Sequence, residues 1–518
     1  MKLRIAIGIA LLIFIAAPLY AQVKKKQVRA KLKKENRIVK EEVESPTIIP
    51  SANSESSNHL TPGVYIEELP LKFPEISQVA TAIPAFIGYT EKGPNIPIKI
   101  NSLQEYLDIF GGPFLQEIGT FEIDIDGNIS PPEIKNRPKF NMFYMLQMYF
   151  ANGGGECFVV SAGNYATVNN SDMLMALQRL DQEFHTTLLL FPDALSSLNS
   201  NNPAVLYQAA LEESSKRKNR FVICDVDEVN QNIVSSIEQF RTSIGNQNLA
   251  YGAAYFPFLE TTLKYVYAED QIQIKLQGSH RRGVLKHSDE TIAENPEKIE
   301  ESLYHVQNGD YRNVYHEIKD MIDEIHLKLP PSAAVAGVYV HTDQTRGVWK
   351  APANVALNKV KEVSLIIDDS RQSFLNVHHS GKSINAIRNF SGKGIMVWGG
   401  RTMAGNDLEK RYISSARFVG MVDASITNAL QELPKSPNDQ ETWQKVKLMA
   451  ENYLMNLWRD GALQGTKPEK AFFVRIGLNE TMTEQDVLQG KLNLQVGLSI
   501  MKPSEFFIIN ISQSLNSN

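Results

Sequence analysis

Apolar segments that alternate with amphipathic segments over residues 157–257 constrain the fold of this chain more than any other feature. Between four apolar runs, three stretches have the spacing of helices. The predicted strands are residues 157–160, 187–191, 220–225 and 250–257, and the predicted helices are residues 173–184, 204–216 and 233–243. Because neighbouring parallel strands are usually joined by a helix, the alternation predicts an α/β domain with a mostly parallel sheet and helices on both faces.

Segments on either side of this alternation extend the same domain. Further strands are predicted at residues 81–90, 363–367 and 395–398, and helices at residues 103–110, 140–150 and 333–340. Ser102 with Glu105 forms a capping box for the first of these helices, and Ser332 is expected to cap the last. Asp126-Gly127 predicts a hairpin turn. A charged, helix-prone segment, residues 263–329, interrupts the alternation and indicates an insertion on the surface.

The C-terminal part begins with a long amphipathic helix. Apolar residues recur every three or four positions from Trp443 to Leu457, which predicts one buried stripe. Asn438 or Asp439 can cap the start of this helix, and Gly461 can end it in the left-handed conformation.

Three strands follow that helix. A turn at Thr466-Lys-Pro468 leads into a Phe-rich strand at residues 471–476, and residues 492–498 alternate as a half-buried strand does. The apolar run 506–511 predicts a final strand, placed where a chain can donate a strand outward. Together these elements predict a smaller α+β domain.

Several separated motifs occur in one order along the chain. They are TPGVYIEE at residues 61–68, IPAFIGYT at 83–90, FGG at 110–112, NGGG at 152–155, RGVWKAPAN at 346–354 and KPSEFF at 502–507. Together with residues 454–474, they resemble the contractile tail sheath proteins of phages and of phage-tail-like injection systems. The resemblance covers about residues 61–512, and motifs in order are more specific than any one of them.

The resemblance implies a structural protein and not an enzyme. A sheath subunit polymerises helically around an inner tube and drives that tube by contraction. The family implies a subtilisin-like layered α/β domain, a C-terminal sheath domain, and extended arms that pair with the C-terminal domains of neighbouring subunits. The arm residues are Gly63, Val64, Tyr65, Ile66 and Glu67 near the N-terminus and Phe506, Phe507, Ile508 and Ile509 near the C-terminus.

The implied partners are copies of the same chain, the inner tube protein, and baseplate and terminator proteins, with no cofactor. We divide the chain into a signal-like segment (1–22), a basic and Ser/Asn-rich linker (23–60), an N-terminal arm with the first strands (61–115), an α/β domain (116–403, with an insertion at 262–330) and a C-terminal sheath domain (404–518).

Charge and cysteine content exclude some function classes. The net charge of -5 gives no reason to expect a nucleic-acid partner, because proteins that track phosphates carry a basic excess. Cys157 and Cys224 each lie in an apolar run, which favours buried free thiols over a disulfide. No cysteine spacing typical of a metal site occurs.

Candidate catalytic residues do not form a recognisable set. A subtilisin-like layout raises the question of a triad, yet Asp193 and His185 have no serine in a nucleophile-elbow context. The sequence Gly381-Lys382-Ser383 resembles the end of a phosphate-binding loop, but Asn376 stands where that loop needs glycine.

The histidines also do not indicate a catalytic or metal-binding site. His378 and His379 are adjacent, so on a strand or a helix their side chains would point in different directions. His280 and His287 are expected to be exposed residues of the insertion. We therefore predict no catalytic, cofactor-binding or metal-binding residues.

The N-terminus conflicts with the rest of the sequence. Lys2 and Arg4 precede an apolar run at residues 5–17, a pattern typical of a signal peptide or a short membrane anchor. Residues 24–40 are strongly basic, which favours a solvated linker over a weak tether to an anionic membrane. A sheath assembles inside the producing cell by family resemblance, so we expect cytoplasmic assembly. The alternative, a secreted α/β enzyme or binding protein, is supported by residues 1–22 alone.

Overall fold

The computed structural model describes residues 75–515, apart from residues 125–127, 277–298, 307–311, 432, 434–435 and 503. The chain splits into a unit Met1–Lys72 and a unit Phe73–Asn518, and only the second contains described residues. The signal-like segment, the linker, the arm at residues 61–68, the Asp126-Gly127 turn, and His280 and His287 lie outside the described residues.

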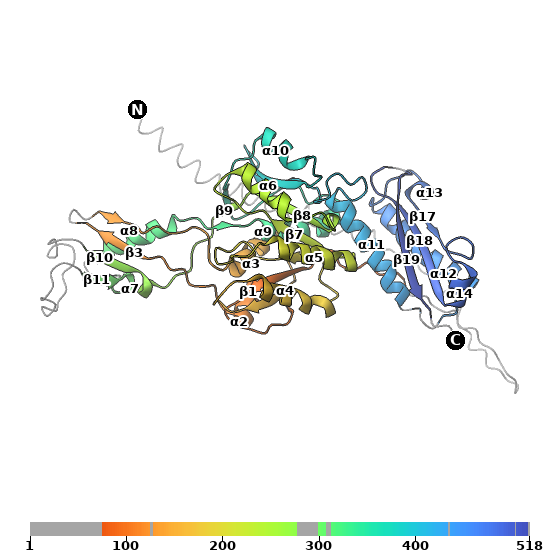
Figure 1. Ribbon diagram of the computed structural model, residues 1–518, viewed down its shortest axis with the longest axis horizontal. Coiled ribbons are helices and arrows are strands. Elements are labelled where there is room, and N and C mark those ends of the chain that lie inside the picture. Colours follow the sequence, from red (N-terminus) through yellow and green to blue (C-terminus); the bar gives the residue numbers. More distant parts are fainter. Residues whose placement is uncertain are drawn as a thin grey trace, which may run out of the picture. The chain divides into compact units, whose positions relative to one another are not determined.

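The described strands form one large sheet and three small ones. The large sheet has nine strands in the order β13-β16-β15-β8-β7-β6-β1-β5-β2 (Figure 1). Their bounds are β1 (Pro84–Tyr89), β2 (Ile98–Ile100), β5 (Cys157–Gly163), β6 (Leu188–Leu190), β7 (Phe221–Asp225), β8 (Gly252–Phe256), β13 (Val355–Ala356), β15 (Ile384–Phe390) and β16 (Gly394–Trp398). Neighbours from β5 to β15 pair in parallel, and β2, β16 and β13 join antiparallel. The predicted mostly parallel sheet is confirmed.

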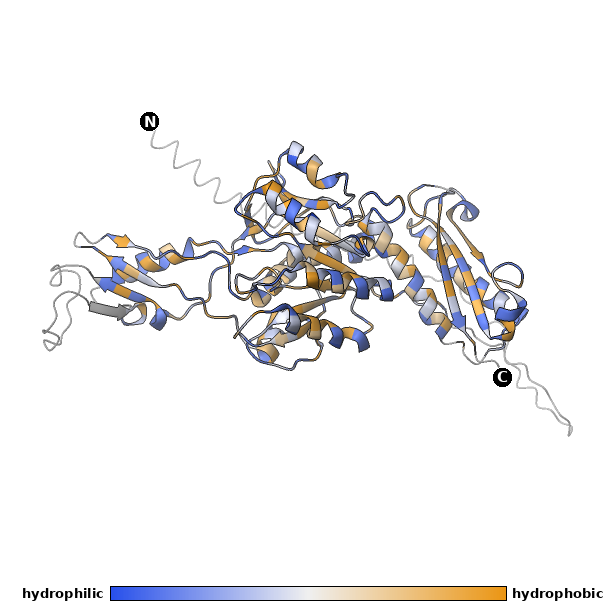
Figure 2. Ribbon diagram, viewed as in Figure 1, coloured by the Kyte–Doolittle hydropathy of each residue, from blue (hydrophilic) through white to orange (hydrophobic). Residues whose placement is uncertain are grey.

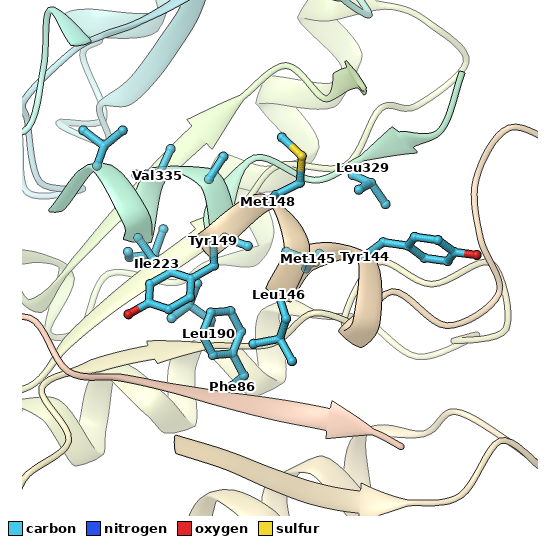
Figure 3. Close-up of a cluster of buried hydrophobic side chains, with 14 of the residues drawn as sticks. Phe86, Tyr144, Met145, Leu146, Met148, Tyr149, Leu190, Ile223, Leu329 and Val335 are labelled. Carbon is cyan, nitrogen blue, oxygen red and sulfur yellow. The ribbon is translucent and has the colours of Figure 1, made fainter. Parts of the chain in front are cut away.

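One face of this sheet is covered by α3 (Met142–Ala151) and α9 (Ser332–Arg346). Figure 3 shows Tyr149 and Leu146 of α3 above Phe86 of β1. The two helices approach closely because Gly337 has no side chain: a Cβ there would lie 2.6 Å from the Tyr149 carbonyl oxygen.

The other face is covered by α4 (Asn170–Gln178), α5 (Ala204–Arg217) and α6 (Ile233–Ser243), whose apolar residues form a second buried cluster. Helices on both faces were predicted from the alternation, and they leave the sheet interior inaccessible to water. Two shorter helices flank the sheet, α2 (Leu103–Phe110) and α10 (Asp369–Asn376).

Three local predictions in this domain were wrong. Ser332 does not cap α9: Pro331 occupies the N-cap position, and Ser332 instead donates its amide and hydroxyl to Asp225 at 2.8 and 2.6 Å. The strand predicted at residues 363–367 lies earlier, as β14 (Val360–Val363), and the Ser364 amide and hydroxyl that follow it both donate to the Phe258 carbonyl. The helix predicted at residues 173–184 starts and ends earlier, as α4, and continues as a 3-10 turn at Arg179–Gln182.

The insertion contributes strands that were not predicted. β10 (Gln273–Leu276) and β11 (Ile299–Ser302) form a four-stranded sheet with β3 (Thr120–Ile123) and β4 (Ile129–Ser130). This sheet and the helices α7 (Leu303–Val306) and α8 (Arg312–Asp323) enclose a small apolar core. A third sheet joins β12 (Lys328–Leu329), β9 (Leu259–Thr261) and β14.

The C-terminal elements form the predicted α+β arrangement. The helices are α11 (Ile413–Gln431), α12 (Gln440–Arg459), α13 (Pro468–Ala471) and α14 (Glu484–Leu488), and the strands are β17 (Phe472–Arg475), β18 (Lys491–Ser499) and β19 (Phe506–Ser514). Asp439 caps α12 by accepting from the Thr442 amide, and Gly461 follows the helix at a φ of 79°. One apolar core joins α11, α12 and the inner face of the sheet.

Candidate assembly surface

β19 is an edge strand of the C-terminal sheet, whose described order is β17-β18-β19. It pairs antiparallel with β18 along its whole length, from Phe506 opposite Ser499 to Ser514 opposite Lys491. Figure 2 shows the alternation of apolar and polar residues along both strands. Ile509 on the inner face is buried, whereas Ile508 on the outer face is 42% exposed. The predicted C-terminal arm therefore pairs within its own subunit and keeps one open edge.

The outer face of this sheet carries an apolar patch next to that edge. The Phe473 ring covers Gly497, where a Cβ would come within 2.1 Å of the ring. Phe506 packs edge-on against Phe473 with ring centres 5.1 Å apart, and the Arg475 guanidinium lies 4.7 Å from the Phe473 ring centre. Phe473 and Phe506 are half-buried, and with the exposed Ile508 they leave apolar surface beside a strand edge, which is typical of a protein contact.

A groove of about 140 Å³ lies between β19 and α11. Phe507 to Asn510 form one wall, and the other wall comes from α11 together with Lys218, Ala250, Tyr251 and Lys410. The Lys218 ammonium forms an ion pair with the Asp423 carboxylate at 3.0 Å. The groove therefore places a strand edge, small helix residues and charged groups together.

The N-terminal end of the described chain lies against the same domain. Ile76 and Val79 pack on the C-terminal core, and the Val79 amide donates to the Ser425 hydroxyl of α11 at 3.0 Å. Residues 76–79 and the predicted C-terminal arm, residues 506–509 at the start of β19, thus both belong to this domain, whereas residues 61–68 lie outside the described residues.

A buried ion pair holds α11 to the α/β domain. Arg417 binds both carboxylate oxygens of Asp343, at 3.0 and 2.6 Å, and donates to the Thr81 carbonyl at 2.8 Å. Arg417 was not among the predicted functional residues, although a basic residue on the apolar stripe of a helix is a signal of such a pair.

The residues considered for catalysis have structural roles. Asp193 is fully buried and accepts hydrogen bonds from the Asn141 and Tyr89 amides at 2.6 and 2.8 Å, and burial raises its pKa to about 6. His185 is exposed, and among the described residues its hydrogen bonds and ion pair are with Glu183. Asp193 and His185 are not brought together with a serine nucleophile in any contact of the described chain.

The near-match to a phosphate loop is likewise packed into the protein. Lys382 donates its ammonium to the Arg241 carbonyl at 2.5 Å, and the Ser383 hydroxyl donates to the Asn376 carbonyl at 2.6 Å. A Cβ at Gly405 would lie 1.8 Å from the Ser383 Oγ. A phosphate would therefore have to displace these contacts.

The histidine pair differs from its prediction. The His378 and His379 rings do not diverge: their centres are 3.8 Å apart, because both follow the end of α10 in a turn. In the described part of the chain, no three His, Cys, Asp or Glu side chains are grouped to hold a metal ion.

Cys157 and Cys224 are buried free thiols as predicted, and burial raises the pKa of both. Among the described helices, none combines the length and the apolar character needed to cross a membrane.

Comparisons with known proteins agree on one family. A family model described as the phage tail sheath C-terminal domain matches residues 406–514. The chain is 30% identical to the anti-feeding prophage helical sheath in its contracted state, over 88% of this chain and 99% of that one, with a TM-score of 0.58. It is 27% identical to the sheath complex of the extracellular contractile injection system PVC in its contracted state, over 88% of this chain and 98% of that one, also with a TM-score of 0.58.

A phage protein also matches. The chain is 24% identical over 156 residues to a tail sheath protein of Vibrio phage KVP40, a match that spans 30% of this chain and 22% of the phage protein. The matches to the two injection-system sheaths cover nearly all of each relative, and they include the α/β domain as well as the C-terminal one. The chain therefore belongs to the contractile tail sheath family and is a structural sheath subunit.

Proposed function

We propose that this subunit polymerises helically around an inner tube and that the resulting sheath drives the tube by contraction. One observation carries the proposal: the anchor of the N-terminal arm at Val79 and the edge strand β19 lie on the same small domain. Arms that leave one domain and bind the same domain of a neighbour make heterologous contacts, and such contacts generate filaments when the rotation does not close.

The arm residues 63–67 and 506–509 are proposed to pair with the C-terminal domains of neighbouring subunits. β19 pairs with β18 of its own subunit, so its open edge is the place where a neighbour's strand can add. Contraction would then be a change of packing between two helical lattices, with the arms keeping subunits connected.

The proposed partners follow from the similar structures, which are named as contracted sheaths and as an anti-feeding prophage baseplate. From these we propose an inner tube, a baseplate and a terminator as partners, and no nucleic acid. The layering of the α/β domain is proposed to be subtilisin-like, with the boundaries 116–403 and 404–518, and no catalytic activity is proposed.

Assembly is proposed to take place in the cytoplasm of the producing cell. Mass spectrometry of the N-terminal peptide, in separate cytoplasmic and exported fractions, tests this. Assembled subunits are expected in the cytoplasm, starting at Met1 or within residues 24–61. A dominant exported species starting at Gln22 would overturn the assignment.

Deletion of residues 61–68 tests the arm model. Without this arm we expect folded subunits that no longer form tubes in sedimentation and electron microscopy. Deletion of residues 51–58, also eight residues and rich in Ser and Asn, is the matched control and should leave tubes intact. Tubes of normal length from the first variant would contradict the model.

A further inference from the structure

Lys410 is a charged residue that lines the groove between α11 and β19. Its ammonium lies 5.2 Å from the Tyr251 ring centre and 5.8 Å from the Phe507 ring centre. Aromatic faces attract a cation at such distances but do not neutralise it. Among the described residues, no carboxylate forms an ion pair with Lys410, whose side chain is half-buried.

The rest of the groove is balanced in charge. Its charged lining residues are Lys218, Lys410 and Asp423. Asp423 pairs with Lys218 at 3.0 Å, which leaves the groove with one unmatched positive charge, that of Lys410. On the α11 wall, the Lys218 carbonyl covers Gly420, where a Cβ would lie 2.4 Å from its oxygen, so the apolar lining available to a partner on this wall is Ala416 and Val419.

These features specify the chemistry of an occupant. The β19 edge favours an extended segment, the groove favours apolar side chains in alternation, and Lys410 favours a carboxylate at one end. One segment outside the described residues has this pattern: Val64 and Ile66 alternate, and Glu67-Glu68 follow them.

We propose that Lys410 binds the acidic end of the N-terminal arm. Residues 63–68 of a second copy occupy the groove, and Glu67-Glu68 pair with the Lys410 ammonium. This inference rests on the proposed function. It specifies the register in which the arm binds the groove and the ion pair that fixes this register. Each copy has one groove and one acidic arm, so binding between copies repeats without closing, as a sheath requires. Binding within one copy would use up both and prevent growth.

Two complementary variants test this pairing. Lys410→Glu reverses the charge in the groove and leaves the arm unchanged. The double variant Glu67→Lys with Glu68→Lys reverses the charge of the arm and leaves the groove unchanged. Like charges brought together at an interface cost enough to weaken assembly by at least about tenfold, so each variant alone should stay monomeric at wild-type assembly concentrations. Mixed together, the two variants match in both directions: the acidic arm of the first fits the groove of the second, and the lysine arm of the second fits the reversed charge in the groove of the first. Analytical ultracentrifugation should therefore show monomers for each variant alone and large assemblies of alternating subunits in the mixture, and a mixture that stays monomeric would contradict the pairing.

Combining all three substitutions in one chain provides the rescue. The reversed charges match again, so tubes should return with a critical concentration within about threefold of the wild type, as expected when an exposed pair contributes little net energy. Lys447→Glu on α12, outside the groove, is the matched control and should assemble normally. Lys410→Gln removes the charge without reversing it, and thermal denaturation confirms that each variant is folded.

The outcomes separate this inference from the proposed function. If Lys410→Glu assembles like the wild type while deletion of residues 61–68 abolishes tubes, the arm model stands and the role of Lys410 is wrong. If the triple variant does not recover although it is folded, the pairing of Lys410 with Glu67-Glu68 is wrong. Tubes that survive the arm deletion refute both.

Discussion

Asp225 is a buried carboxylate at the junction of the large sheet and α9. It is held by the amide and hydroxyl of Ser332, at 2.8 and 2.6 Å, and burial raises its pKa from 3.8 to about 7. Because the folded state binds the proton more tightly than the unfolded state, this residue favours folding at low pH. Its contribution is lost as the pH rises from about 4 to about 7 and is constant above that window.

The substitution Asp225→Asn should therefore flatten the pH dependence of the free energy of unfolding. In the wild type, Asp225 lowers that free energy by up to about 1.4 kcal/mol per pH unit inside the window. Urea denaturation at several pH values measures the slope, and Asp108→Asn at an exposed position of α2 is the control. Parallel curves for Asp225→Asn and the wild type would show that Asp225 does not titrate there.

Single residues also mark the limits of sequence reasoning. Asp439 and Ser102 were predicted as caps and act as caps, because the pattern that identifies them is local. Ser332 has the same local pattern, but the buried carboxylate of Asp225, 107 residues away, takes its hydroxyl. A long-range acceptor of this kind has no signal in a single sequence.

Among the elements, α12 is the helix that the sequence predicted most completely. Leu457 belongs to the predicted stripe and is 3% exposed in the C-terminal core, whereas Leu448 on the same helix is 58% exposed. Leu457→Ala should lower the free energy of unfolding by about 2–5 kcal/mol, because it removes buried methyl groups and leaves a cavity.

Leu448→Ala makes the same chemical change on the exposed side and should stay within about 0.5 kcal/mol of the wild type. Chemical denaturation of the two variants measures the difference. Equal losses in both would mean that the stripe is not the buried face of the helix in the isolated subunit.

β19 is an element whose existence was predicted but whose pairing was not. Its apolar run indicated a strand, and Ile509, Ile511 and Leu515 now belong to the core of its own domain. Deleting residues 505–518 would thus remove core side chains as well as an arm, so that deletion cannot separate folding from assembly. The strands β10 and β11 were missed because their charged sequence gives no signal that β10 pairs with β3, more than 150 residues away, and that β11 pairs with β10.

At the scale of the whole molecule, the alternation of strands and helices predicted the central sheet, and the ordered motifs predicted the family. The assembly surface was predicted only as two arms. The contact of Val79 with Ser425 of α11 depends on tertiary structure and has no signal in the sequence. The Arg417 ion pair with Asp343, which fixes α11 to the α/β domain, also depends on tertiary structure.

Electron cryomicroscopy of the purified full chain is the most direct test of the central claim that this subunit builds a sheath through its arms. We expect hollow helical tubes in which density for residues 61–68 of one subunit runs along the β19 edge of a neighbour. Discrete particles under conditions where the chain is folded, or tubes in which this segment stays on its own subunit, would contradict the claim.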